Sequence, residues 1–289
     1  MRPHLVRDIR ILAQVLRVDP PKASAEPHEL LGPLIERVST LAAEALRSLC
    51  RELADGGAVQ PELPRLEVFK SPLAGESAPL GVRTLEPIRP GRFLCFYPGR
   101  VFEPDEPRLP RSDKIISNEY EAMYCDGAGW LPLHMKESPL LADCGTAFWH
   151  GNRLAIGNLL NHPPAGTLPS AVPMAMRWPT WQELGEASPA LWARLVPHVA
   201  VREGRVVRTA SGEVLPAGSD KSKVWFPAWP HTSLALVAAR ALEPGEEVFF
   251  NYRMHSREES RGAANFPAWY HPVDEEAFEA EVARSRFEE

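Results

Sequence analysis

The sequence has little that would build a metal site or a disulfide framework. Its four cysteines, Cys50, Cys95, Cys125 and Cys144, lie far apart, and no two of them form a C-x-x-C pair. Zinc knuckles and thioredoxin-like redox sites need such pairs, so both are excluded. No secretory apolar segment opens the chain. Because thiols stay reduced in intracellular compartments, we expect an intracellular protein of the cytoplasm or nucleus.

Long apolar runs and lysines are also scarce. Runs such as 234–239 fall far short of the ~18 residues that a membrane span needs, so no membrane association is expected. Only six of the 32 basic residues are lysines, and the formal net charge is −6. Nucleic-acid-binding proteins usually carry a basic stripe, so we expect no direct binding to nucleic acid. An acidic surface suits a basic protein partner instead.

The first sixty residues predict two amphipathic helices. Apolar residues recur at helical spacing near the start of the chain: Leu5, Ile9, Leu12 and Leu16. A second helix is predicted from about Pro33 to Ala54, since proline suits the first helical position. An Arg-rich amphipathic start is also typical of mitochondrial presequences, but Asp8, Asp19 and the lack of serine disfavour that interpretation.

From residue 65 the pattern changes to short strands separated by proline and glycine turns. The apolar or β-branched segments are 66–69, 81–85, 93–97, 234–239 and 248–250. Asp126–Gly127 predicts a hairpin, and Ser211–Gly212 gives a weaker signal of the same kind. Thr180–Glu183 has the form of a capping box that opens a helix to about Leu195. The 30 prolines, about twice the usual ~5% usage, also favour short strands and ordered loops.

Four short segments carry the candidate chemistry. In chain order they are Gly81–Thr84 with Arg89–Gly91, Tyr97–Gly99, Gly157–His162 and Arg240–Tyr252. Singly each is weak, because Asn-His and Pro-Gly-Glu are also ordinary turn sequences, and Tyr252 is compatible with a core tyrosine. Their joint occurrence in this order is much more specific.

These segments resemble the motifs of the SET domain, the fold of most protein-lysine methyltransferases. Gly81 resembles the second glycine of the family's first cofactor loop, and Tyr97-x-Gly99 its Tyr-x-Gly step. Asn161–His162 resembles the Asn-His motif, and Gly245–Tyr252 the closing motif. The resemblance covers about 66–256 with a long insert, and it is closest to the subgroup of SET domain-containing protein nine.

The resemblance implies the fold and its division. We expect a mainly β SET fold of small twisted sheets with a knot-like C-terminal crossing, preceded by an α-helical N-terminal region. The expected parts are a helical region 1–64 without catalytic residues, a SET domain 65–256 with an insert at about 165–230, and a C-terminal flank 257–289. In that crossing the Asn161 segment passes beneath the loop to Tyr252, which would put both residues in one pocket.

The resemblance also implies the function, which is S-adenosylmethionine-dependent methyl transfer to a lysine of a protein substrate, for example a histone-like protein. By resemblance the catalytic residues are Tyr252 and Tyr97. The cofactor-binding residues are Gly81, Asn161, His162, Tyr252 and Trp269, and Phe250 and Tyr270 line the substrate channel. No metal is expected. Phe250 carries no hydroxyl, which favours a channel that admits more than one methyl group.

The sequence departs from the family pattern at several positions. Pro79 stands where the first cofactor-loop glycine is usual, Pro163 where serine is usual, and Asn251 where aspartate is usual; the family's cysteine-rich zinc cluster is missing. The alternative function is therefore a weakly active or inactive module that binds lysine-containing segments. In place of the zinc cluster, we expect the aromatic residues Phe266, Trp269 and Tyr270 either to cover the channel or only to anchor the tail.

Overall fold

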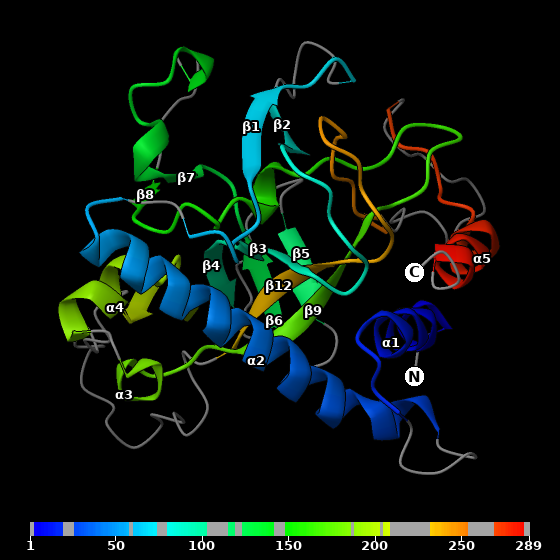
Figure 1. Cartoon of the computed structure of the whole chain (residues 1–289), viewed down its shortest axis with the longest axis horizontal. Helices are drawn as coiled ribbons and strands as arrows, with labels where there is room; N and C mark the ends of the chain where they lie inside the picture. Colours follow the sequence, from blue (N-terminus) through cyan, green and yellow to red (C-terminus); the bar gives the residue numbers. More distant parts are fainter. Residues whose placement is uncertain are drawn as a thin grey trace.

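The computed structural model places small sheets at the centre of the molecule, with a long helix along one side and two short helices at one end of it (Figure 1). The structure describes residues 3–19, 26–57, 60–73, 80–102, 115–118, 123–141, 148–185, 188–202, 205–208, 232–253 and 269–285. Pro79, Cys144, Phe266 and the Ser211–Gly212 hairpin signal lie outside these ranges.

Two N-terminal helices are present, α1 (Pro3–Val15) and α2 (Pro27–Ala54). The prediction that the second helix begins at Pro33 is wrong. The main-chain N–H of Glu26 donates to Glu29 Oε2 at 2.7 Å, and Pro27 occupies the first turn. This side-chain cap starts the helix earlier and leaves Pro33 inside it.

Helix α2 closes the main core rather than forming a layer of its own. Its buried face packs on strands β3 (Phe93–Tyr97), β9 (Ala171–Arg177) and β12 (Thr232–Ala238). One apolar cluster combines Leu34 and Leu46 of α2 with Phe96 and Trp178, and none of these side chains is more than 2% exposed. Burial of this kind contributes about 25 cal/mol per Å² of apolar surface, so the helix and the sheet stabilise each other.

The strands form four small sheets, and most of their pairs are antiparallel. The first pairs β1 (Leu66–Lys70) with β2 (Leu80–Thr84), and the second has the order β3-β12-β9. The third has the order β11-β10-β4-β6-β5, with bounds Arg205–Arg208, His198–Arg202, Gly99–Phe102, Met123–Asp126 and Ile115–Asn118. The last pairs β7 (Trp130–Pro132) with β8 (Phe148–His150) in parallel, as β10 also pairs with β4.

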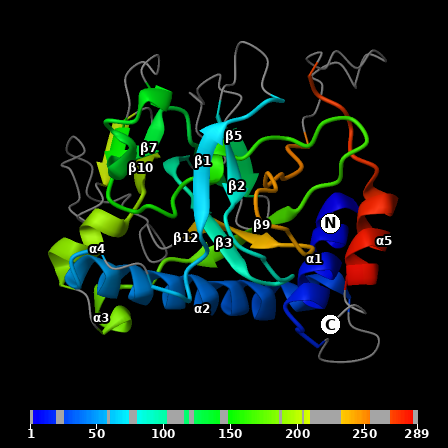
Figure 2. The same cartoon turned by 45° about the horizontal axis from the view of Figure 1, so that its top comes forward.

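Helix α5 (Glu275–Ser285) packs beside α1, so the first and last helices of the described chain lie together (Figure 2). Phe278 and Val282 of α5 are each 1% exposed and belong to the main core. Gln14 Nε2 also donates to the carbonyl oxygen of Val282 at 3.2 Å. The last helix is therefore part of the folded body.

The architecture corrects several sequence predictions. The chain mixes helices and strands and is not mainly β, because α2 and α5 contribute to the same core as the sheets. The small antiparallel sheets are as expected, whereas a knot-like crossing is not confirmed. Residues 171–177, within the expected insert, form β9 in the central sheet. Phe249 and Phe250 make isolated bridges, and residues 248–250 form no strand.

Two turn predictions have different outcomes. Asp126–Gly127 does not form a hairpin, because β6 pairs with β4 and β5, and β7 pairs with β8. The Thr180 capping box is confirmed, since Glu183 N–H donates to Thr180 Oγ1. The helix that it opens is shorter than predicted: α3 (Trp181–Leu184) ends at Gly185, whose φ is +71°, and α4 (Pro189–Leu195) follows with Ser188 as its cap.

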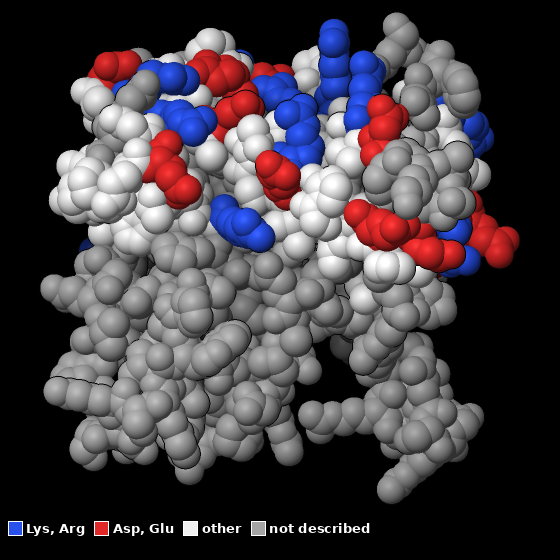
Figure 3. All heavy atoms as spheres, turned by 90° about the horizontal axis from the view of Figure 1, so that it is seen from below, with Lys and Arg blue, Asp and Glu red and all other residues white. Residues whose placement is uncertain are grey.

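Surface charges of both signs are interspersed over the described residues of the face drawn in Figure 3. Exposed ion pairs such as Arg83–Glu67, at 2.7 Å, contribute little to stability. Among the described residues, no helix is long and apolar enough to cross a membrane, and no cluster of three metal-ligating side chains occurs. Cys50, Cys95 and Cys125 are buried and form no disulfide with one another.

Candidate functional site

Two segments far apart in the sequence run side by side at the candidate site. Asn161 and Phe249 form a parallel bridge, and the main-chain N–H of Phe250 donates to the carbonyl oxygen of Asn161 at 3.2 Å. The residues predicted to act together, Asn161 and Tyr252, therefore lie on neighbouring segments.

Tyr252 is held at both its main chain and its hydroxyl. The hydroxyl donates to the carbonyl oxygen of Leu160 at 2.6 Å, and the main-chain N–H donates to His162 Nδ1 at 3.3 Å. Its ring lies 4.8 Å from that of Phe250, between centroids. These contacts fix the side chain in one orientation beside the Asn161 segment.

His162 lies between the two segments and the C-terminal part of the chain. Its Nε2 lies 2.7 Å from the carbonyl oxygen of His271, and its ring stacks on Tyr270 with centroids 4.4 Å apart and planes at 25°. Because Nδ1 accepts from Tyr252, the proton resides on Nε2, which donates to His271. Burial lowers the pKa of His162 below its ordinary value, which favours this neutral form.

A buried carboxylate, Glu247, completes the site, and the sequence analysis did not single it out. Ser71 Oγ donates to its Oε2 at 2.8 Å, and Asn161 Nδ2 donates to its Oε1 at 2.9 Å. Asn161 Nδ2 also donates to the carbonyl oxygen of Leu80 at 3.0 Å. The sequence signal was available, since Glu247 is the second glutamate of the Gly245–Tyr252 motif.

The structure gives Gly81 a specific reason to be glycine. A Cβ atom at this position would lie 2.3 Å from Glu247 Oε1, which is closer than any real side-chain contact. The resemblance to the SET family had given Gly81 only as a cofactor-binding residue. Within the chain, the Glu247 carboxylate lies against Gly81, and any side chain at this position would have to displace it.

Aromatic rings continue from Tyr252 in two directions. On one side Phe250 contacts Tyr97 edge to face, with centroids 6.4 Å apart, and both rings are almost fully buried. On the other side Trp269 meets Tyr252 edge to face at 6.2 Å and is 46% exposed. Tyr270, predicted in the substrate channel, stacks on His162, and Trp269, predicted at the cofactor, contacts Tyr252.

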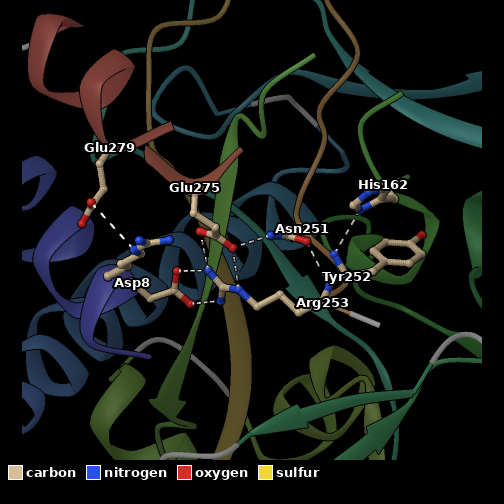
Figure 4. Close-up of polar contacts among 8 residues, drawn as sticks. Asp8, His162, Asn251, Tyr252, Arg253, Glu275 and Glu279 are labelled. Atoms are coloured by element: carbon tan, nitrogen blue, oxygen red, sulfur yellow. Dashed lines mark hydrogen bonds and ion pairs between the residues drawn. The ribbon is translucent and has the colours of Figure 1, made fainter. Parts of the chain in front are cut away.

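Asn251 and Arg253, on either side of Tyr252, connect the site to both terminal helices (Figure 4). Asn251 Nδ2 donates to Glu275 Oε1 at 2.8 Å. The Arg253 guanidinium forms two hydrogen bonds with Asp8 and contacts Glu275 at 3.3 Å. Burial alone lowers the pKa of Arg253, but the Asp8 hydrogen bond and both negative charges outweigh it and raise the pKa.

Comparison with known proteins gives structural neighbours only. No family model matches the chain, and no curated protein matches it. Solved structures that resemble it include KRYPTONITE in complex with mCHG DNA and SAH, at 15% identity, 66% coverage of this chain, 24% of that chain and a TM-score of 0.31. Arabidopsis thaliana SUVH6 in complex with SAM has 15% identity, 66% coverage of this chain, 27% coverage of that chain and a TM-score of 0.30.

The Chaetomium thermophilum polycomb repressive complex 2 gives 15% identity, 80% coverage of this chain, 20% of that chain and a TM-score of 0.35. The chain thus spans about a fifth to a quarter of the length of these neighbours, which are SET-domain methyltransferases. They do not support the subgroup of SET domain-containing protein nine. At TM-scores this low, the function of this chain has to be inferred from its own contacts.

Proposed function

We propose that this chain is a SET-type methyltransferase that transfers a methyl group from S-adenosylmethionine to a lysine side chain of a protein substrate. The observation that carries the proposal is the pairing of residues 160–162 with 249–252. It brings the Asn-His motif and the closing tyrosine together across about ninety residues of sequence, as the resemblance to the SET family requires. The net charge of −6 supports a basic substrate.

The residues around Glu247 fit the charged end of this cofactor. The two amide hydrogens of Asn161 are already donated to Leu80 and Glu247, so the Asn161 side chain offers a ligand only its Oδ1 acceptor. The Glu247 carboxylate accepts two hydrogen bonds within the chain and has further lone pairs. Two acceptors, one of them a carboxylate, match the α-ammonium group of S-adenosylmethionine. The stacked pair of His162 and Tyr270 provides flat faces suited to a purine ring.

When bound, S-adenosylmethionine supplies a methyl group on a sulfonium, which an uncharged amine can take by direct displacement. The chain then has to align the amine and exclude water rather than provide a strong base. The Tyr252 hydroxyl donates a hydrogen bond to the carbonyl oxygen of Leu160, so toward the amine its oxygen acts as an acceptor of an N–H. Tyr97 and Phe250 provide buried apolar walls on the same side of Tyr252.

Calorimetric titration of the chain 1–289 with S-adenosylmethionine tests this proposal. We expect micromolar binding by the parent and, for Glu247→Gln, binding weaker by about tenfold, since a charge-assisted hydrogen bond is lost. Glu246→Gln is the matched control, because Glu246 is next to Glu247 in sequence but its carboxylate pairs with Arg240 at 2.5 Å. Binding that is absent in the parent, or equal in both variants, contradicts the proposed site.

The alternative, a module that binds lysine-containing segments without a cofactor, is favoured by one observation. Phe250, Tyr252 and Trp269 form a run of contacting rings, and aromatic faces attract ammonium groups. The two functions are distinguished with the H3(1–15) peptide, which one neighbour binds. Peptide binding that is independent of S-adenosylmethionine, without transfer of a labelled methyl group, would support the binding module.

A further inference from the structure

Arg253 has a backbone conformation that its own residue type does not favour. Its φ is +47°, and among the described residues only Arg17 shares a positive φ without being glycine. Left-handed backbone costs free energy for any residue with a Cβ atom, so surrounding contacts must hold it. One such contact is local, since the Arg253 N–H donates to Asn251 Oδ1 at 3.0 Å.

The side chain of Arg253 provides the stronger contacts. Asp8 accepts two hydrogen bonds from the guanidinium, of which Nη2 to Oδ1 is 2.7 Å, and Glu275 lies 3.3 Å from Nε. All three side chains are largely shielded from water, with exposed fractions of 17% for Arg253, 4% for Asp8 and 18% for Glu275. A planar guanidinium with a carboxylate on each of two sides is held in direction as well as in position.

The two carboxylates come from opposite ends of the chain. Asp8 belongs to α1 and Glu275 begins α5, and these helices also contact each other directly, as in the Arg7–Glu279 pair at 3.9 Å (Figure 4). Glu275 follows closely after Tyr270 and His271, which stack on and hydrogen-bond to His162. The guanidinium therefore joins both terminal helices to the residue next to Tyr252.

We propose that Asp8 and Glu275 act as positioning residues for the site: by holding Arg253 from two sides, they keep Tyr252 and residues 269–271 in place against residues 160–162. This inference rests on the proposed function for its effect on catalysis, but its structural part stands apart from it. It assigns a positioning role to the first helix, in the region that the sequence analysis expected to hold no catalytic residue. Neither carboxylate touches the reacting atoms in this scheme.

The test uses the chain 1–289 carrying Asp8→Asn or Glu275→Gln, which preserve side-chain size and remove one charge. The matched control is Arg7→Gln, which removes an ion pair between the same two helices without touching Arg253. Hydrogen–deuterium exchange is measured for peptides covering 160–162, 249–253 and 269–271. Affinity for S-adenosylmethionine and kcat of methyl transfer to the H3(1–15) peptide are measured in parallel.

We expect Asp8→Asn to speed exchange at 249–253 by about tenfold or more, because local opening becomes easier when a buried ion pair is broken. The kcat falls by a similar factor, while KM for the peptide changes less than threefold. Arg7→Gln leaves 249–253 unchanged. Glu275 is the more exposed partner, so Glu275→Gln should raise exchange at 249–253 and lower kcat by smaller factors. This variant tests the inference if Asp8→Asn does not fold.

Exchange at 249–253 that stays at the parent rate in both carboxylate variants overturns the inference. So does an equal effect of Arg7→Gln, since the terminal helices would then act only by packing. If the parent binds no S-adenosylmethionine, the proposed function fails, and the exchange measurements still decide whether the carboxylates hold Tyr252.

Discussion

The Tyr252 hydroxyl donates a hydrogen bond to the main-chain carbonyl oxygen of Leu160 at 2.6 Å, across 92 residues of sequence. A tyrosine hydroxyl can rotate, and this contact fixes where its proton points. The remaining lone pairs then face other neighbours in a defined direction. In the proposed function, this fixed hydroxyl is the group that orients the amine.

Tyr252→Phe tests the role of that hydroxyl. We expect methyl transfer to fall by at least about 100-fold, because an orienting hydrogen bond to the reacting amine is lost. S-adenosylmethionine affinity should change less than threefold, and the free energy of unfolding should fall by about 1 kcal/mol for the lost Leu160 bond. Single-turnover assays and calorimetry separate these effects. Transfer at the parent rate would refute the assigned role.

Gly81→Ala tests whether the glycine serves Glu247. The new methyl group would meet the carboxylate at 2.3 Å, so either Glu247 or β2 has to move. We expect a loss of about 1–3 kcal/mol in unfolding free energy, as for other overpacked sites, together with weaker binding of S-adenosylmethionine. Denaturant unfolding and calorimetry measure the two quantities.

Gly32→Ala is the control for this experiment. Gly32 lies in α2, and a Cβ atom there meets nothing within 4 Å. The substitution should stabilise the chain by about 0.5–1 kcal/mol, because alanine is the better helix former. A Gly81→Ala chain as stable as the parent would show that Glu247 and Gly81 do not constrain each other.

The sequence predicted the parts of the site that lie inside short motifs. Asn161, His162 and Tyr252 were expected together from the order of those motifs, and their segments do pair. The pairing of Asp8 with Arg253 carries no local signal, because it depends on where α1 and α5 dock. Contacts between separately predicted elements are set by tertiary packing, which sequence periodicity does not encode.

The misplaced helix start has a different cause. Pro33 was an equally valid first helical residue by its chemistry, yet Glu26, Pro27 and Glu29 start the helix earlier. Two competing start signals lay six residues apart. Packing of Leu30, which is 8% exposed, favours the earlier one, because the longer helix buries more apolar surface.

Stability should fall in mild acid because of His150. Burial, with a smaller contribution from the charge of His134, lowers the pKa of His150 from 6.5 to about 3. The folded chain therefore favours the neutral ring. The contribution of neutral His150 to the free energy of unfolding is fully present above about pH 6.5. It declines as the pH falls toward 3, with a loss of about 2 kcal/mol at pH 5.

His150→Phe should remove this part of the acid dependence and keep the stacking on Trp130. Denaturant unfolding at pH 5 and pH 8 measures the difference for parent and variant. His28→Gln, at an exposed position of α2, serves as the control and should retain the parent's slope. Identical slopes for parent and His150→Phe would contradict the prediction.

The last prediction concerns Trp269, which is expected either to cover the site or only to anchor the C-terminal segment. Truncation after Tyr252 cannot separate these roles, because it also removes Phe278 and Val282 from the main core. A point substitution is cleaner. Trp269 is 46% exposed and contacts Tyr252 and Tyr270 edge to face, so Trp269→Ala removes these ring contacts and leaves the main core in place.

If Trp269 covers the site, Trp269→Ala should lower kcat by about tenfold, since water entering beside the amine weakens its alignment. The unfolding free energy should fall by about 1–2 kcal/mol, because a half-buried ring loses its apolar contacts. Trp181→Ala is the matched control, because that tryptophan is 39% exposed at the start of α3. It should leave kcat at the parent value. A parent-like kcat in Trp269→Ala would contradict the covering role. Trp269 would then only anchor the C-terminal segment, through its ring contact with Tyr252.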